Sequence, residues 1–478
     1  MINTKFWAKE SEFCGLFVCD EWSNSTKFEL QNDENKKLTT RLLDAWTAPE
    51  CSITDVRILF LLGADPEALY ENKEGDRLLE EREQTGTVCS MCLSKYQEFL
   101  QYAKQIYDAQ FNSTPIRISQ KRLKAEKRKL FAVSLDGGGM RGLVSITCLL
   151  FASRRLLGDE SLPNLADWFV GCSTGSMLSL ALAKGNSITD TFFLYFEMKN
   201  IIFLDKSTMK RLFGNVVEKQ TARVEGVLDR VFGDEKDTFA QCPKRLTVPT
   251  LDISTTPGRL HVFRNYPVRN KKSFEDVKLR DAARASSAAP TYFNAHEMGD
   301  HRFVDGSLVA NCPLNVLFAE YDKSLQAGQA IQLGLVLSVG TGEPKESKRR
   351  YRSGTSIGRR GRHLADLAVL LMEQVVGHEK SVIQSAEDRC AASGIPFTRI
   401  CPVGINVRID QIDDGKLIDM VWSSLLWLHS NIDLIDEFGE KLVDLLGEPT
   451  DMAANKPIAR RHQSVGPQIR RERRQTTS

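Results

Sequence analysis

Apolar and polar positions follow two different patterns along the chain, and the change falls near residue 130. Up to about residue 120 the sequence is polar and mixed, with apolar residues at helical spacing in 36–46 and 91–107. From 130 to about 342, short apolar runs alternate with helical segments. We therefore expect a helical N-terminal region over 1–120 and an α/β domain over 130–342. That domain should be a three-layer sandwich whose mostly parallel sheet is covered by helices on both faces.

The individual runs predict separate elements within and after this α/β region. Strands are expected at 130–135, 168–170, 245–253, 261–265 and 331–339, and helices at 143–157 and 177–184. Two later stretches with helical spacing, 363–376 and 416–445, predict a helical C-terminal region over 343–446. The tail over 447–478 is rich in proline, glutamine and arginine, so we expect it to be disordered.

One N-terminal segment, 55–79, has turn residues spaced as in a repeat unit. Its apolar helix ends at Gly63, where glycine can take the left-handed cap conformation. Asp65 and Pro66 then turn the chain, and Gly75 marks the next turn. The segment resembles one ankyrin unit, but the pattern does not recur about 33 residues later. It is either a degenerate ankyrin unit or a helix with a Gly-Asp-Pro stop, and its apolar face should pack on the neighbouring region.

Composition and charge exclude several classes of protein. The chain has 478 residues, of which 42% are hydrophobic and 26% charged, so a well-packed core is expected. A formal net charge of +2 gives no global argument for a nucleic-acid partner. The start lacks the pattern of a secretory signal, and no apolar run reaches the roughly eighteen residues of a membrane span. The eleven cysteines fit a reducing compartment. These features predict a cytoplasmic protein, with peripheral membrane attachment as an alternative.

Three further features have ordinary structural explanations beside functional ones. Cys89 and Cys92 form one Cys-x-x-Cys motif without a matching second pair, so we expect two partly buried thiols rather than a zinc or redox site. The basic run 121–129 is expected to be a solvated helix, and a patch attracted to anionic lipid is the alternative. The stretch 421–428 holds two tryptophans among leucines. It is expected to be a buried helix face, and an interfacial lipid contact is the alternative.

A glycine-rich loop, DGGGMRG at 136–142, lies between the predicted strand 130–135 and the predicted helix 143–157. Four glycines in seven positions let backbone N–H groups approach a ligand, and the helix start adds uncapped donors. Such a loop can bind a phosphate or a developing oxyanion. No Gly-Lys-Ser/Thr follows, as a Walker A loop would require, and the glycine spacing does not favour a dinucleotide.

A second motif, GCSTG at 171–175, again lies between a predicted strand and a predicted helix. A sharp turn at such a place needs small residues beside Ser173, and it sets the hydroxyl clear of the sheet at a helix N-terminus. GxSxG sequences are common by chance in surface turns. The strand–turn–helix context therefore makes Ser173 a candidate nucleophile.

A serine nucleophile needs a proton acceptor, and Asp305 is the candidate. Asp305 and Gly306 follow the apolar strand end at 301–303. An acid before a glycine is most often a plain turn. If this loop meets Ser173, however, Asp305 could accept the proton directly, with no histidine between them.

Histidine is the competing base. The sequence contains His261, His296, His301, His363, His378, His429 and His462. His363 and His378 follow the acid, as the chain order of a Ser-Asp-His triad requires. Both lie in helical patterns rather than in a loop that closes a sheet, so we expect neither to be catalytic.

The three motifs, in this order, resemble the signature of the patatin-like phospholipase family. That signature has a glycine-rich oxyanion loop, a GxSxG elbow and a DG-A/G dyad motif, to which DGGGMRG, GCSTG and DGS correspond here. Two further runs, HVFRNY at 261–266 and ARASSAAPTYF at 283–293, resemble segments of the animal-type calcium-independent phospholipases A2. Those enzymes also carry ankyrin repeats upstream. The resemblance spans about 130–342, which is less than half of the chain.

The resemblance implies a set of roles at named positions. Ser173 and Asp305 would form a Ser–Asp dyad that acts through an acyl-enzyme. The backbone N–H groups of three residues would form the oxyanion hole: Gly137, Gly138 and Gly139. Arg141 would neutralise a lipid phosphate, although a salt bridge in the first helix turn is its alternative role. Neither a metal nor a cofactor is expected, because the dyad and the backbone donors supply the activation.

Three positions depart from the usual pattern of the family. Cys172 precedes the serine, Ser176 replaces a frequent glycine, and Ser307 follows the Asp-Gly pair. All three residues are small, so they should leave the fold intact and could alter substrate preference or rate.

The sequence thus predicts a hydrolase of phospholipid acyl esters at a membrane surface, without a transmembrane segment. An acyltransferase, triacylglycerol lipase or thioesterase on the same scaffold is an alternative. A signalling or binding module with secondary hydrolysis is another, in which the N-terminal region would bind a protein partner.

Overall fold

The computed structural model describes residues 27–48, 52–85, 90–125, 128–202, 216–269, 276–344 and 379–448. Three predicted features lie outside these ranges. They are the helix over 363–376, nearly all of the tail that begins at 447, and Cys89 of the Cys-x-x-Cys motif.

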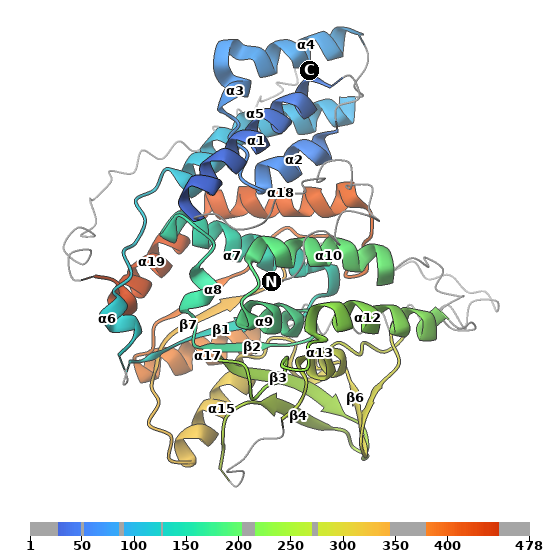
Figure 1. Cartoon of the computed structure of the whole chain (residues 1–478), viewed down its shortest axis with the longest axis vertical. Helices are drawn as coiled ribbons and strands as arrows, with labels where there is room; N and C mark the ends of the chain where they lie inside the picture. Colours follow the sequence, from blue (N-terminus) through green and yellow to red (C-terminus); the bar gives the residue numbers. More distant parts are fainter. Residues whose placement is uncertain are drawn as a thin grey trace, which may run out of the picture.

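An eight-stranded sheet forms the centre of the molecule (Figure 1). Its strands are β1 (Leu130–Leu135), β2 (Trp168–Gly171), β3 (Arg245–Asp252), β4 (Arg259–Arg264), β5 (His296–Met298), β6 (His301–Val304), β7 (Leu333–Val339) and β8 (Phe397–Ile400). Their order is β5-β6-β3-β2-β1-β7-β8, and β4 pairs with β3 off this path. Strands β1, β2, β3, β7 and β8 pair in parallel, whereas β4, β5 and β6 join through antiparallel pairs. The prediction of a mostly parallel sheet is confirmed, and β8 shows that the segment after 342 also contributes a strand.

Helices cover both faces of the sheet, because successive side chains of each strand point to opposite sides. In β1, Phe131, Val133 and Leu135 enter one apolar core, and Ala132 enters the other. The first core includes residues of α7 (Gly142–Leu157), α9 (Thr174–Lys184) and α13 (Leu279–Ser286). The second includes residues of α15 (Leu314–Gln326) and α17 (Lys380–Ser393). The predicted three-layer architecture is therefore present.

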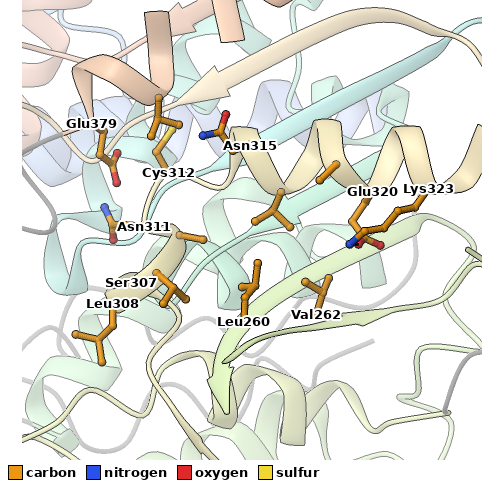
Figure 2. Close-up of a pocket in the computed structure, with 15 residues that line it drawn as sticks. Leu260, Val262, Ser307, Leu308, Asn311, Cys312, Asn315, Glu320, Lys323 and Glu379 are labelled. Carbon is orange, nitrogen blue, oxygen red and sulfur yellow. Dashed lines mark hydrogen bonds and ion pairs between the residues drawn. The ribbon is translucent and has the colours of Figure 1, made fainter. Parts of the chain in front are cut away.

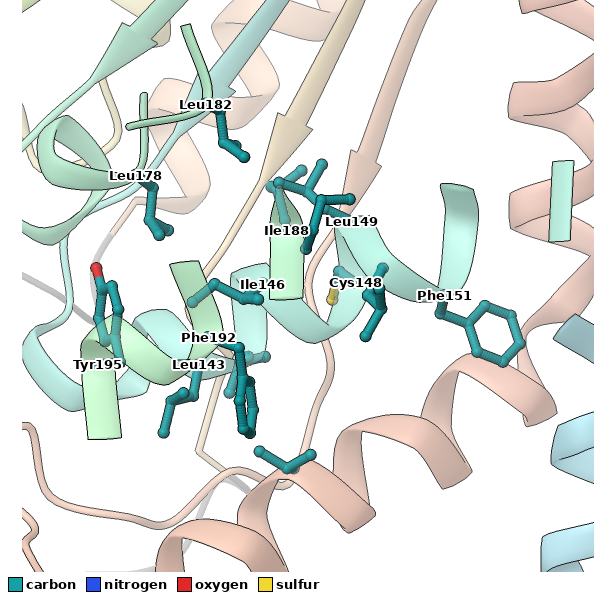
Figure 3. Packing of buried hydrophobic residues seen from close by; sticks show 14 of the residues in the cluster. Leu143, Ile146, Cys148, Leu149, Phe151, Leu178, Leu182, Ile188, Phe192 and Tyr195 are labelled. Carbon is teal, nitrogen blue, oxygen red and sulfur yellow. The ribbon is translucent and has the colours of Figure 1, made fainter. Parts of the chain in front are cut away.

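The helix that follows the GCSTG motif is held firmly in the first core. Figure 3 shows Leu178 and Leu182 of α9 near Leu143 and Ile146 of α7 and Phe192 of α10 (Ile188–Ile202). All five side chains are buried. Their spacing of three or four residues along each helix places them on one face. This packing fixes α9, whose first turn follows Ser173.

Two N-terminal helices, α2 (Ile53–Leu61) and α5 (Ser90–Phe111), pack on α18 (Asp414–Ser430), which comes from the other end of the chain (Figure 1). The remaining N-terminal helices pack on these two or on one another, and they are α1 (Lys27–Thr47), α3 (Glu67–Tyr70), η3 (Glu71–Lys73) and α4 (Glu74–Thr85). The centroid of the Trp422 ring lies 5.8 Å from the ring centroid of Phe60 and 5.2 Å from that of Phe99. Arg57 donates a 2.7 Å ion-paired hydrogen bond to Asp419. The stretch 421–428 therefore presents Trp422 to the core, as expected.

Several predicted boundaries differ from the structure by a few residues. The predicted helix at 177–184 begins three residues earlier, and the stretch 416–445 divides at Asn431 into α18 and α19 (Ile432–Leu446). Gly63 follows α2 with a φ of 110°, so the predicted left-handed glycine is confirmed. The other helices are α6 (Gln120–Leu123), η4 (Gly139–Arg141), α8 (Leu162–Leu165), α12 (Val216–Phe232) and α14 (Ser307–Ala310). Within the described ranges, no helix has both the length and the apolar character needed to span a membrane.

Candidate active site

Ser173 occupies a strained turn between β2 and α9. Its φ of 50° and ψ of −120° are rare for a residue with a side chain, and such strain is typical of functional sites. The turn is possible only with glycine on both sides. A Cβ at Gly171 would lie 2.1 Å from the carbonyl oxygen of Gly175, and one at Gly175 would lie 2.1 Å from that of Leu135. The GCSTG sequence thus forms the predicted strand–turn–helix elbow.

The structure brings Ser173 and Asp305 into direct contact. Ser173 Oγ donates a 2.8 Å hydrogen bond to Asp305 Oδ2, and the second carboxylate oxygen accepts a 2.7 Å bond from the Ser307 N–H. Asp305 is only 1% exposed. It follows β6, whose end pairs with β3, and this pairing carries the Asp-Gly turn to the serine. A serine hydroxyl bonded to a buried carboxylate has a proton acceptor already in position.

Burial changes the acidity of Asp305. Removal from water disfavours the carboxylate and raises the pKa of Asp305 to about 6, while hydrogen bonds from Ser307 and Ser173 act in the opposite direction. At neutral pH the group is therefore still mainly ionised. A carboxylate with a pKa just below the working pH is a better base than an ordinary aspartate.

The backbone around the elbow is held by a serine for which the sequence pattern predicted no role. Ser286, at the end of α13, accepts a 2.9 Å hydrogen bond from the Ser173 N–H and donates a 2.7 Å bond to the Pro249 carbonyl. The Gly306 N–H donates to the Ser286 carbonyl at 3.0 Å. Ser286 thus joins the serine turn to the aspartate turn. Its place in the run ARASSAAP was the sequence signal for it.

The three glycines predicted as oxyanion donors do not have equivalent surroundings. The Gly137 N–H already donates to the carbonyl of Asn311 at 3.1 Å. Gly138 and Gly139 line the pocket that contains Ser173, and the structure gives their N–H groups no acceptor among the described residues. Gly139 has a φ of 57°, and a Cβ there would lie 2.4 Å from the Ile409 carbonyl oxygen. Glycine is therefore required where the loop turns toward the pocket.

The pocket at Ser173 is lined mainly by apolar side chains. Beside Gly138, Gly139, Ser173 and Asp305, its walls include Met140, Met177, Tyr195, Met198, Val224, Tyr292, Phe293 and Ile409. Methionine side chains are flexible and adapt to irregular apolar ligands. The arrangement offers a nucleophile, a base and two free N–H donors beside an apolar wall, which suits attack on an ester that carries a hydrocarbon chain.

Arg141 and the described histidines lie elsewhere. Arg141 is 7% exposed at the end of η4, and it is not among the described residues that line the pocket. His301 bonds to Asp252 at 2.7 Å, and His296 lies 3.4 Å from Asp281. His363 and His378, the competing bases in the sequence, lie outside the described residues, as does His462.

A second, larger pocket has the residues of α14 in its lining (Figure 2). Its volume is about 330 Å³, and Ser307 also contributes to the pocket at Ser173. At one end, Glu379 and Asn311 point toward each other, and Cys312 lies beside them (Figure 2). The far end is formed by Glu320 and Lys323, which are paired at 2.9 Å.

One group of potential metal ligands adjoins this pocket. Side-chain donor atoms of Asp136, Cys312 and Glu379 lie within 4.8 Å of one another. However, the Arg399 guanidinium already pairs with Asp136 at 2.5 Å. Burial, and secondly the charge of Asp136, raise the pKa of Glu379 to about 9, so this acid is protonated at neutral pH. A fixed cation and a neutral acid both oppose the binding of a metal ion.

Comparison with known proteins adds a family and several relatives. The family model described as patatin-like phospholipase matches residues 133–318. An intracellular phospholipase A2 of Caenorhabditis elegans is 28% identical over 386 residues, which cover 76% of this chain and 34% of the relative. The 85/88 kDa calcium-independent phospholipase A2 of Mus musculus is 29% identical over 345 residues, which cover 66% of this chain and 40% of the relative.

A bacterial relative matches over more of its own length. A cGAMP-activated phospholipase of Pseudomonas aeruginosa is 31% identical over 257 residues, which cover 52% of this chain and 73% of the relative. By contrast, the chain spans only 34% and 40% of the two animal relatives. The matched family segment contains both Ser173 and Asp305, and it ends before β7 and β8.

Proposed function

Since the chain belongs to the patatin-like phospholipase family, we propose that it is a serine-dependent lipid acyl hydrolase that cleaves fatty-acyl esters of phospholipids. The observation that carries this proposal is the 2.8 Å hydrogen bond from Ser173 Oγ to the buried Asp305 carboxylate, beside an apolar pocket. Names of the relatives support the same chemical class. Cleavage would release a fatty acid and a lysolipid.

The first half of the reaction forms an acyl-enzyme. Asp305 accepts the Ser173 proton as Oγ attacks the ester carbonyl, and the carbonyl π electrons move onto oxygen to give a tetrahedral oxyanion. The N–H groups of Gly138 and Gly139 donate to this oxyanion, and loss of one such donor typically costs about 3–4 kcal/mol. When the intermediate collapses, the bond to the lysolipid oxygen breaks, and that oxygen takes the proton from Asp305.

The second half regenerates the serine. A water molecule attacks the acyl carbonyl and gives its proton to Asp305, and the same N–H donors stabilise the second oxyanion. Collapse then breaks the bond to Ser173 Oγ, which recovers the proton. One aspartate therefore serves as base and acid in both halves, and no metal or cofactor enters the scheme.

The apolar lining of the pocket supports an acyl chain as the group that is transferred. Met177, Met198 and Phe293 give the pocket apolar walls next to Ser173. A hydrocarbon chain placed there would leave water at about 0.8 kcal/mol per buried CH₂. The role that the family resemblance implied for Arg141, contact with the lipid phosphate, receives less support, because Arg141 does not line the pocket.

The decisive experiment measures fatty-acid release from mixed phospholipid vesicles in the presence of EGTA. Wild type, Ser173→Ala and Asp305→Asn are compared, and the lysolipid identifies the ester bond that is cut. Release by wild type alone is expected. A folded wild-type protein that releases no fatty acid would contradict phospholipid hydrolysis and direct the search to other acyl esters, thioesters or acyl acceptors.

A covalent probe tests the nucleophile separately. A fluorophosphonate should label wild type and leave Ser173→Ala unlabelled, because the probe reacts only with an activated serine. Equal labelling of both proteins would exclude Ser173 as the nucleophile.

A further inference from the structure

Arg399 reaches the glycine-rich loop from a strand far away in the sequence. It lies on β8, which pairs in parallel with β7 at the edge of the sheet. Its Nη2 donates a 2.5 Å hydrogen bond to Asp136 Oδ2, and its Nη1 donates a 2.7 Å bond to Ser338 Oγ. The two side chains of the ion pair are buried, at 12% exposed for Arg399 and 3% for Asp136. The pair therefore lies in a region of low dielectric, where it is weakly screened.

The Arg399 side chain can cross β7 only because a glycine lies in its path. Gly340 follows β7, and a Cβ at this position would lie 2.6 Å from Arg399 Nη2 and 2.4 Å from Cys401 Sγ. Glycine at 340 thus leaves the space through which the guanidinium reaches Asp136. Ser338, which lies on β7, then fixes the orientation of the guanidinium through its hydrogen bond. The geometry is specific for a planar, forked donor group.

Asp136 is the residue from which the oxyanion loop departs. Its N–H donates to the Val339 carbonyl at 3.2 Å, which is the last contact with the sheet before Gly137. The three residues that follow are glycines and have no side chains to fix their position. The loop must therefore be held by its neighbours, and Asp136 supplies the charged side chain for this purpose.

Two other contacts of the loop also come from late parts of the chain, beside those that Thr174 and Asn311 make with it. Thr341 Oγ1 donates to the Gly137 carbonyl at 3.1 Å, and the Met140 N–H donates to the Ile409 carbonyl at 2.8 Å. These residues, like Arg399, lie beyond the segment 133–318 that the family model matches. The C-terminal part of this chain thus forms one side of the loop's support.

From these contacts we propose that Arg399 is a positioning residue for the oxyanion loop. Its ion pair with Asp136 holds the start of the loop so that the Gly138 and Gly139 N–H groups face the ester carbonyl at Ser173. This inference rests on the proposed acyl-hydrolase function for its catalytic consequence. The loop-holding role itself is independent of activity. Removal of the guanidinium leaves an unpaired buried carboxylate and frees the loop.

The test compares Arg399→Gln with a matched control, Arg389→Gln. Arg389 lies on α17 and pairs with Asp322 near the surface, so the same substitution there removes an arginine without touching the loop. Amide hydrogen exchange reports on the loop directly. Arg399→Gln should speed exchange in 137–142 at least tenfold relative to α9, and Arg389→Gln should not. Unchanged exchange in 137–142 would overturn the proposal whatever the activity.

A kinetic test then addresses the oxyanion. A thionoester carries sulfur in place of the carbonyl oxygen and gains little from an oxyanion hole, so the ester-to-thionoester ratio of kcat/KM reports on the donors. Arg399→Gln should lower kcat for a short-chain ester about 10- to 100-fold with little change in KM, and it should reduce this ratio. A ratio equal to that of wild type would overturn the catalytic role, because general loss of structure slows both substrates alike.

Two further variants keep the test informative. Arg399→Lys retains the charge without the fork, and it should recover part of the lost kcat. The double variant Asp136→Asn with Arg399→Gln removes both charges of the pair and leaves neither unpaired, so it should fold even where Arg399→Gln is unstable. It should still show fast loop exchange. If wild type cleaves no ester, the proposed function fails, and the exchange measurement alone decides whether Arg399 holds the loop.

Discussion

Ser173 Oγ lies 2.8 Å from Asp305 Oδ2, so the hydroxyl contacts the carboxylate that we propose as its proton acceptor, with no third side chain between them. A triad would place an imidazole at this position. The described histidines lie outside the Ser173 pocket, and two of them pair with aspartates elsewhere. In the proposed mechanism one carboxylate therefore acts as both acid and base, so the pKa and burial of Asp305 decide the rate.

Replacement of Asp305 by asparagine should nearly abolish ester hydrolysis. Asparagine keeps the shape and can still accept a hydrogen bond, but it cannot take the proton, and a positioned base contributes about 10²- to 10⁴-fold. We expect kcat/KM to fall by that factor with the fold retained. Asp300→Asn, in the exposed turn between β5 and β6, is the control and should keep full activity. Activity of Asp305→Asn within threefold of wild type would show that another group is the base.

The acidity of Asp305 predicts the pH dependence of hydrolysis. Burial raises the pKa of Asp305 to about 6, and only the ionised form can accept the serine proton. The rate should therefore be constant above about pH 7 and should fall tenfold per pH unit below about pH 6. Measurement of kcat/KM on a neutral short-chain ester between pH 4 and pH 8 checks this. A profile that stays flat down to pH 4.5 would contradict the raised pKa.

Much of this site could be predicted from sequence, because its parts are local. Ser173 and the glycine loop each lie at a strand–turn–helix junction, and such junctions leave a clear mark in the pattern of apolar runs and glycines. Asp305 was also marked by its Asp-Gly turn. Its meeting with Ser173 was only a hypothesis, because antiparallel pairing of β6 with β3 brings them together. β5 and β6 contain three and four residues, which are too few for a periodic pattern to show.

The supporting residues could not be predicted, because their roles arise from contacts between distant segments. Arg399 and Asp136 are separated by 263 positions, and β8 is a four-residue strand between the two predicted helical stretches of the C-terminal region. The backbone carbonyl of Asn311 accepts a hydrogen bond from the Gly137 N–H. Such a contact does not depend on the side chain, so the sequence does not indicate it. Sequence therefore predicted which groups react, and the structure was needed to find what holds them in place.

The packing of Trp422 predicts that it stabilises the fold rather than attaching the protein to lipid. Its ring contacts Phe60 and Phe99, and its indole N–H donates to Glu98 at 2.6 Å. Trp422→Ala should lower the free energy of unfolding by about 3–5 kcal/mol. Trp427→Ala, on the partly exposed part of α18, should cost less. Urea unfolding measures both. Weaker vesicle binding by a stably folded Trp422→Ala protein would instead support an interfacial role.

The raised pKa of Glu379 predicts that the folded protein loses stability as pH rises, which is the opposite of the usual effect of an acidic group. Burial, and then the charge of Asp136, raise the pKa of Glu379 from its ordinary value of 4.5 to about 9. Below pH 4.5 both the folded and the unfolded protein hold the proton, so no penalty exists. Between pH 4.5 and 9 the unfolded chain loses the proton while the folded chain retains it, and this difference increasingly favours unfolding.

Glu379→Gln should therefore stabilise the protein, and more strongly as pH rises. Glutamine resembles the protonated acid and cannot ionise, so it removes the penalty, which is of the order of a few kcal/mol at pH 8. Melting temperatures at pH 5 and pH 8 should show a gain over wild type that is small at pH 5 and several degrees at pH 8. Glu387→Gln, on the exposed side of α17, should show no such dependence. An equal gain in melting temperature for Glu379→Gln at both pH values would mean that Glu379 ionises normally in the folded protein. The ion pair of Asp136 and Arg399 would then lie beside a charged Glu379 rather than a neutral one.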